Sequence, residues 1–196
     1  MEQWLRPRTK FLIDPVVNAL AKLGVTPNGL TVFGALLNVV AGALIALGQP
    51  FWGGVMMTVI AMPADALDGS LARATGRQTK FGGFLDSVLD RFAEGAILLG
   101  MAWWFLQRGD ATSTWACFFA LLGSIMVSYT RARAEGLGLE CKVGLFSRFG
   151  RFVLIALGLL AYPLFPQSLV VMIWALAVLS TFTAIQRIVY VYRIAE

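Results

Sequence analysis

The chain has 196 residues, of which 58% are hydrophobic, and its mean hydropathy is +0.74. Soluble domains are about half apolar, so this composition excludes an ordinary water-soluble fold and indicates an integral membrane protein. The formal net charge of +5 describes a membrane surface that attracts anionic lipid and phosphorylated substrates, and not a nucleic-acid interface. The chain has no histidine, which excludes the usual zinc-hydroxide sites and nucleophiles activated by histidine.

The amino-terminal segment, residues 2–23, mixes apolar side chains with Arg6, Arg8, Lys10 and Lys22. It is too polar to cross a bilayer, so we expect an amphipathic helix that lies in the membrane interface. A Thr-Pro-Asn sequence at residues 26–28 then predicts the turn and helix start that open the first membrane span.

Six apolar stretches of about 20 residues follow, which is the length a helix needs to cross the hydrocarbon core. We predict transmembrane helices over residues 30–49, 52–72, 84–106, 112–133, 149–165 and 168–188. The expected fold is therefore an all-α integral membrane protein. Residues 1–196 form one domain, with the interfacial helix at 2–23 and a six-helix bundle at 30–188. Pro63, inside the second stretch, predicts a kink.

The basic residues predict the orientation of these spans. If the amino terminus is cytoplasmic, every lysine and arginine except Arg108 lies on the cytoplasmic side. The positive-inside rule demands this asymmetry. The outer connections, near residues 49–50, 107–113 and 163–168, are short. The chain is therefore expected to be a multi-pass protein of the plasma membrane with its active site at the cytoplasmic face.

Four aspartates interrupt this apolar sequence: Asp65, Asp68, Asp86 and Asp90. Carboxylates at membrane depth are costly, so they indicate a functional site. Their spacings of three and four residues place each pair on one face of a helix. Two such faces turned toward each other gather charges that need cations, and carboxylate oxygens suit Mg²⁺, Mn²⁺ or Ca²⁺.

Small residues and one arginine share these helical faces. Gly69, Ala72 and Gly82 keep the faces open, and Arg73 carries a planar guanidinium suited to a phosphate. Each small residue alone is more simply explained by helix packing in the membrane. The whole set at these spacings favours a cradle for a metal-bound diphosphate.

The combined pattern resembles the signature of the CDP-alcohol phosphotransferase family at every position. It reads Asp65-x-x-Asp68-Gly69-x-x-Ala72-Arg73, eight residues, then Gly82-x-x-x-Asp86-x-x-x-Asp90. The resemblance, with the six-span layout, extends over nearly the whole chain. It implies transfer of a phosphatidyl-type group from a CDP-linked lipid, either CDP-diacylglycerol or an ether analogue, to an alcohol, with release of CMP. It also implies a homodimer.

The resemblance further implies two divalent cations, Mg²⁺ with Mn²⁺ as a possible substitute. Asp65 and Asp86 would bridge both ions, Asp68 would bind one, and Asp90 the other. Asp90 would also take the proton of the acceptor hydroxyl as general base. The residues that would contact the CDP-lipid are Asn28, Gly29, Leu30, Thr31, Gly69, Arg73 and Thr79. For Thr79, an ordinary loop hydroxyl is an equal interpretation.

Several arginines lie at predicted cytoplasmic helix ends, where they would favour an acceptor that carries its own phosphate. They are Arg131, Arg133, Arg148, Arg151 and Arg187. For Arg148 and Arg151, topology signalling or lipid head-group binding is an equal alternative. For Arg187, within an apolar run, a functional role is favoured.

The segments around residues 128–135 and 186–187 resemble the phosphatidylinositol-phosphate and archaetidylinositol-phosphate synthases of this family, which use inositol phosphate. The chain departs from the E-R-x-x-R pattern usual in the bacterial branch, because Ser147 precedes Arg148. Phosphatidylglycerophosphate synthase, with glycerol 3-phosphate as acceptor, is the alternative. A cation transporter or channel is a second class, but it predicts acids spread in depth and inverted repeats, which the sequence lacks.

Overall fold

A computed structural model describes residues 14–195, which are helical apart from their connections and contain no strand. The helices are α2 (Pro27–Ala46), α3 (Pro50–Val55), α4 (Met62–Ala74), α5 (Lys80–Leu106), α6 (Ala111–Gly136), α7 (Arg148–Ala161) and α8 (Ser168–Ala195). A π-helical segment, Met56–Ala61, joins α3 to α4. Residues 14–22 are helical, as predicted for the interfacial segment, and residues 2–13 of that prediction lie outside the described part.

Every predicted membrane stretch falls on a helical run, and the predicted all-α class is confirmed. Four runs in the described chain are long and apolar enough to cross a membrane: Pro27–Ala46, Pro50–Ala74, Ala111–Gly136 and Ser168–Ala195. The chain is therefore an integral membrane protein. α5 falls outside this group although it has 27 residues, because charged side chains interrupt it, and α7 has only 14 residues.

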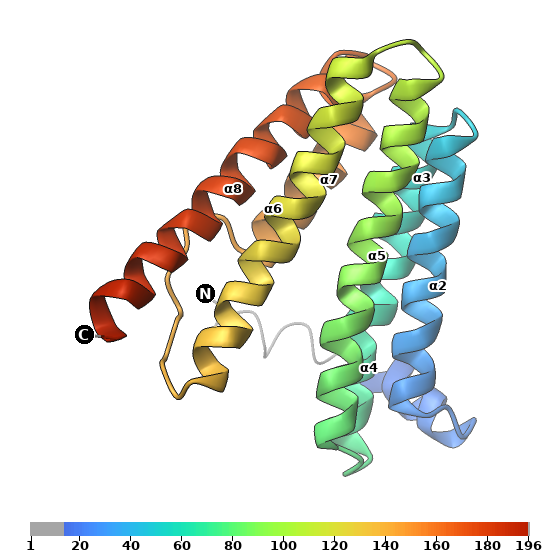
Figure 1. Ribbon diagram of the computed structural model, residues 1–196. Coiled ribbons are helices and arrows are strands. Elements are labelled where there is room, and N and C mark those ends of the chain that lie inside the picture. Colours follow the sequence, from blue (N-terminus) through green and yellow to red (C-terminus); the bar gives the residue numbers. More distant parts are fainter. Residues whose placement is uncertain (1–13, 196) are drawn as a thin grey trace.

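Two helix pairs organise the bundle: α2 packs along α5, and α6 packs along α8. Figure 1 shows that α5 and α6 come together near their short connection and diverge toward their other ends. The close α2–α5 crossing requires glycine. A Cβ on Gly42 would lie 2.8 Å from the Ala96 carbonyl carbon. The largest apolar cluster joins these helices through buried side chains such as Ile45, Met101 and Leu176.

Pro63 lies inside one continuous helical run from Pro50 to Ala74. Proline lacks the amide hydrogen that an α-helix needs at this position, and its ring clashes with the preceding turn. The π-helical turns at Met56–Ala61 directly precede it. Such widened turns absorb the mismatch and are common near functional sites. At the place of the predicted kink, the structure has a π-helical segment that ends one turn before Asp65.

Side-chain caps begin the helices that carry the site. The Thr26 hydroxyl accepts a hydrogen bond from the Gly29 amide (3.1 Å) at the start of α2. The Thr79 hydroxyl accepts one from the Gly82 amide (2.9 Å) at the start of α5. Each cap satisfies an amide that has no partner inside the helix. Both caps lie at the same end of the bundle as the α4–α5 turn (Figure 1).

Candidate metal centre and substrate cavities

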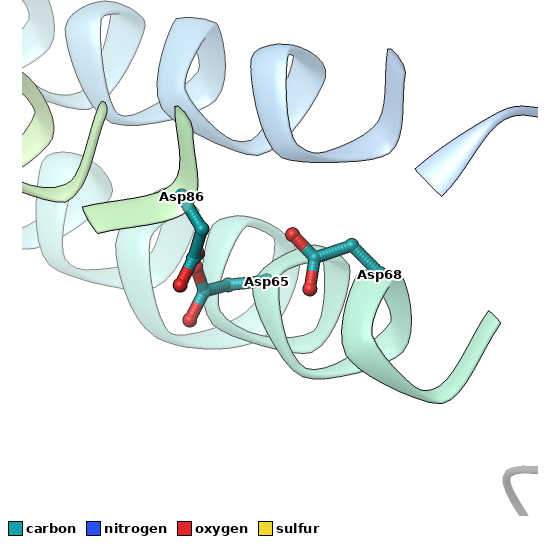
Figure 2. Close-up of side chains that lie close together, drawn as sticks. All are labelled: Asp65, Asp68 and Asp86. Carbon is teal, nitrogen blue, oxygen red and sulfur yellow. The ribbon is translucent and has the colours of Figure 1, made fainter. Parts of the chain in front are cut away.

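Three of the four predicted aspartates gather at one point of the α4–α5 contact. Asp65 and Asp68 extend from α4 and Asp86 from α5, and their carboxylates converge (Figure 2). One oxygen from each lies within 4.8 Å of the others. Such a donor set of hard oxygens fits Mg²⁺ or Mn²⁺, since like charges this close require a cation. The cluster is therefore a candidate metal centre.

Helix α2 supplies a second layer to this centre. The Thr31 hydroxyl donates a hydrogen bond to Oδ2 of Asp68 at 2.6 Å, and both side chains are buried. This contact orients the carboxylate and links the α2 segment predicted to bind CDP-lipid to the acidic cluster. Partners of this kind tune the affinity of metal ligands.

Asp90, the fourth aspartate, lies outside the three-carboxylate cluster. Its Oδ1 contacts Nη2 of Arg148, and its Oδ2 lies 3.4 Å from Nη2 of Arg91. The same Nη2 of Arg148 lies 3.2 Å from Oδ2 of Asp65. Arg148, at the start of α7, therefore bridges Asp65 and Asp90, so the four predicted ligands form a tight trio and an arginine-linked pair that share Asp65.

A cavity of about 230 Å³ borders one side of the aspartates, and we call it the polar cavity. Asp68 and Asp86 line it. So do the predicted CDP-lipid residues Asn28, Thr31, Gly69, Arg73 and Thr79. Two other predicted residues do not. Leu30 is buried in an apolar cluster with Val17 and Leu71, and Gly29 is engaged by the Thr26 cap. The helical periodicity of α2 turns these two away from the cavity.

Gly82 and Thr79 determine how closely α5 approaches α2 at the polar cavity. A Cβ on Gly82 would lie 3.1 Å from both the Asn28 amide oxygen and the Thr79 hydroxyl. A larger residue at position 82 would force these two groups to shift. Thr79 therefore caps the start of α5 and also lines the polar cavity.

A second cavity, of about 260 Å³, borders the other side of the aspartates and is lined by residues of α2, the α3–α4 run, α5 and α7; we call it the inter-helix cavity. Asp65, Asp90 and Arg148 line its polar end. Its apolar lining includes Met57, Ile97, Phe152 and Ile155. Thr31 lines both cavities. The acidic residues therefore stand between a polar cavity and a largely apolar one.

The structure does not bring the predicted acceptor arginines together. Arg148 alone among them lines a cavity. Arg151 is 1% exposed and forms a bidentate pair with Glu94, at 2.7 and 3.1 Å. Its guanidinium is thus held inside the bundle by Glu94, and its role at the acceptor stays a prediction.

The remaining three lie elsewhere at the same end of the bundle. Arg187 donates to the Val143 carbonyl (2.9 Å) and contacts the Val127 carbonyl, so it ties the α6–α7 connection to α8. Arg131 pairs with Glu135 at 2.8 Å on an exposed face, and Arg133 is exposed. None of the three lines either cavity.

Sequence reasoning missed Glu94 and Arg91. Glu94 lines the inter-helix cavity and holds Arg151, while Arg91 contacts Ser128 on α6 and pairs with Asp90. A signal for Glu94 existed, because it follows Asp90 by four residues and extends the Gly82-Asp86-Asp90 stripe by one turn.

Comparison with known proteins gives several concordant results. Residues 24–183 match the family model described as CDP-alcohol phosphatidyltransferase. The archaetidylinositol phosphate synthase of Pyrococcus horikoshii is 40% identical over 185 residues, which cover 94% of this chain and 93% of that protein. The phosphatidylinositol phosphate synthase of Mycobacteroides abscessus is 38% identical over 180 residues, which cover 90% of this chain and 81% of that protein.

Solved structures give the same result. The crystal structure of Mycobacterium tuberculosis phosphatidylinositol phosphate synthase with CDP-DAG bound aligns with a TM-score of 0.87 at 32% identity. The alignment covers 92% of this chain and 93% of that one. The same enzyme in complex with manganese and citrate also aligns with a TM-score of 0.87 at 32% identity, covering 92% of this chain and 88% of that one. The complete aspartate motif, the helical fold and these matches agree, and the chain belongs to the CDP-alcohol phosphatidyltransferase family.

Proposed function

We propose that this enzyme transfers a phosphatidyl-type group from a CDP-linked lipid to inositol phosphate and releases CMP. The donor is CDP-diacylglycerol or its ether-linked analogue. The observation that carries the proposal is the position of the aspartates between two cavities, each of which suits one part of the reaction. Relatives named for inositol phosphate products support the choice of acceptor.

The polar cavity is the proposed place of the CDP group. Arg73 offers a planar guanidinium to a phosphate. Gly69 leaves room for close approach, since a Cβ there would meet, among the described residues and outside the backbone of its own helix, the Arg73 side chain alone (3.4 Å). Asn28 and Thr79 add polar groups to the same lining. The crystal structure of the M. tuberculosis enzyme with CDP-DAG bound supports this assignment of the donor.

The candidate metal centre would hold the cations at Asp65, Asp68, Asp86 and Asp90. When bound, divalent cations neutralise phosphate oxygens and stabilise the charge that develops on the leaving CMP. The manganese complex of the M. tuberculosis enzyme supports a divalent cation in this fold. Thr31 holds Asp68 in orientation through its short hydrogen bond.

Asp90 is the proposed general base. It lines the inter-helix cavity, whereas Asp68 and Asp86 line the polar cavity, so its carboxylate can face an acceptor that approaches from the opposite side. Histidine is absent from the chain, so a carboxylate is the natural group to take the acceptor's hydroxyl proton. Arg148 lies beside it and is suited to the acceptor's phosphate.

The membrane arrangement is part of the proposal. Six spans would place the α4–α5 turn, the α6–α7 connection and the start of α2 at the cytoplasmic face of the plasma membrane. Figure 1 shows the other three connections, which are short, at the opposite end. The charge asymmetry of the sequence supports this orientation. A homodimer is expected from the family resemblance.

A CMP-release assay tests the proposal. Purified protein is incubated with CDP-diacylglycerol, Mg²⁺ or Mn²⁺, and either inositol phosphate or glycerol 3-phosphate. We expect CMP and a phosphatidylinositol phosphate product only with inositol phosphate, and loss of turnover in EDTA. Turnover with glycerol 3-phosphate alone would overturn the acceptor and retain the reaction class. A parallel reaction with an ether-linked CDP-lipid determines the donor.

A further inference from the structure

Arg148 forms an unusual bridge at the boundary of the inter-helix cavity. Its Nη2 atom contacts Oδ1 of Asp90 and lies 3.2 Å from Oδ2 and 3.5 Å from Oδ1 of Asp65. One nitrogen thus serves carboxylates from two helices, α4 and α5, while the arginine itself belongs to α7. Its side chain is 51% exposed, so the guanidinium has access to solvent.

Arg151, one turn later on the same helix, provides the contrast. Its side chain is 2% exposed and is held by two parallel hydrogen bonds to Glu94. If this guanidinium left the pair, the Glu94 carboxylate would remain inside the bundle without its partner, which is costly. The Glu94–Arg151 pair therefore fixes α7 against α5. With that anchor in place, Arg148 can change partners without any movement of its helix.

The two carboxylates that hold Arg148 are both proposed metal ligands. A divalent cation held by Asp65 and Asp90 would lie close to the guanidinium that these carboxylates hold here. The repulsion between two positive groups opposes the simultaneous binding of both. Binding of the cation therefore weakens the hold of the carboxylates on Arg148.

We propose that Arg148 and a divalent cation exchange at Asp65 and Asp90, so that metal loading releases the guanidinium to bind the phosphate of the acceptor. The inference rests on the metal ligands of the proposed function. It assigns Arg148 two successive partners: the carboxylates before the cation binds, and the acceptor phosphate afterwards. The exchange implies an order of binding, in which the cation binds before the phosphorylated acceptor.

Chemical labelling of arginine tests the exchange directly. The full-length protein in detergent is treated with phenylglyoxal in EDTA or in Mg²⁺, and labelled peptides are quantified by mass spectrometry. We expect Mg²⁺ to increase the labelling rate of Arg148 by about threefold or more, as for release from a charge-assisted hydrogen bond. Inorganic phosphate, added after Mg²⁺, should protect it again. Arg151 should stay protected throughout, and exposed Arg193 should label equally in all conditions.

Metal affinity gives a second readout that is independent of turnover. Binding of Mn²⁺ is followed by electron paramagnetic resonance in the wild type and in Arg148→Gln. The variant should bind Mn²⁺ more tightly, by about threefold to tenfold, because the competing cation is removed. Arg193→Gln, at an exposed position in the last turn of α8, removes the same charge and should leave the affinity unchanged.

The outcomes separate this inference from the proposed function. Labelling of Arg148 that is unaffected or slowed by Mg²⁺, or unchanged Mn²⁺ affinity in Arg148→Gln, would overturn the exchange while wild-type turnover upholds the reaction. Absence of Mn²⁺ binding and of CMP release in the wild type would instead refute the metal centre itself. Arg148→Gln need not be active for either measurement.

Discussion

Two ion pairs cross the space between α5 and α7, and they differ in almost every physical respect. Asp90 and Glu94 are one turn apart on α5, and Arg148 and Arg151 are one turn apart on α7. The Glu94–Arg151 pair is bidentate, with side chains 15% and 2% exposed. The Asp90–Arg148 pair uses a single guanidinium nitrogen that Asp65 shares, and the arginine is half exposed.

The difference shows how one motif supports two roles. A buried bidentate pair strongly destabilises the protein when it is broken, because the surviving charge has no partner. In the Asp90–Arg148 pair the arginine is 51% exposed and the aspartate 9% exposed, so the guanidinium has access to solvent and can exchange its partners. The Glu94–Arg151 pair, which we call the inner pair, is therefore suited to hold α7 against α5. The Asp90–Arg148 pair, which we call the outer pair, is suited to take part in the reaction.

Asp90→Asn breaks the outer pair and should produce the largest effect. We expect turnover to fall by about 10²- to 10⁴-fold, the usual contribution of a general base. Binding of Mn²⁺ and CDP-lipid should be partly retained, since the three-carboxylate cluster remains. CMP release and Mn²⁺ binding measure the two effects separately. Asp110→Asn, at the opposite end of the bundle, is the control, because asparagine caps a helix as well as aspartate does. Near-normal turnover in Asp90→Asn would exclude Asp90 as the base.

Arg151→Ala breaks the inner pair, and its main effect should be on stability. Leaving Glu94, whose side chain is 15% exposed, without this partner should cost up to about 3–5 kcal/mol. Thermal unfolding in detergent, followed by circular dichroism, measures the loss. The double variant Glu94→Gln/Arg151→Met should recover much of it, since no unpaired charge remains. If the double variant is as unstable as the single one, the pair is not the source of the effect.

The sequence predicted the helices and the aspartate cluster better than the Glu94–Arg151 pair. The aspartate motif and the apolar stretches are periodic signals, and periodicity identifies helices and their faces. Each predicted stretch accordingly falls on a helical run. The spacings placed each aspartate pair on one helical face, and two such faces turned toward each other were expected to gather four carboxylates; Asp65, Asp68 and Asp86 do converge, and Asp90 lies beside them.

Contacts between distant helices were beyond such reasoning. Nothing local to Arg151 distinguishes it from Arg148, since both lie near the start of α7 and differ only in the face that they occupy. Which face is buried depends on where α5 lies, and that is determined by glycine contacts such as Gly42 against Ala96. The tether formed by Arg187 likewise depends on the path of residues 137–147.

Arg187→Ala tests whether a third arginine belongs with the inner or the outer pair. Its hydrogen bonds to the Val143 and Val127 carbonyls predict a structural role. We expect a loss of about 1.5–3 kcal/mol in stability, typical of hydrogen bonds to a charged group. The KM values for acceptor and CDP-lipid should then change together. A selective increase in the acceptor KM would restore the role predicted from sequence.

Thr31→Val should have the smallest effect and the most local one. Valine keeps the shape of the buried side chain but removes the hydrogen bond to Asp68. Loss of such a supporting partner typically weakens metal binding by about tenfold or somewhat more. Thr31→Ser keeps the hydroxyl and should retain most of the affinity for Mn²⁺. Because Asp65 belongs both to the trio that contains Asp68 and to the bridge formed by Arg148, the effects of Thr31→Val and Arg148→Gln on Mn²⁺ binding should not add in the double variant. Additive effects would mean that Thr31 and Arg148 act on the cation independently.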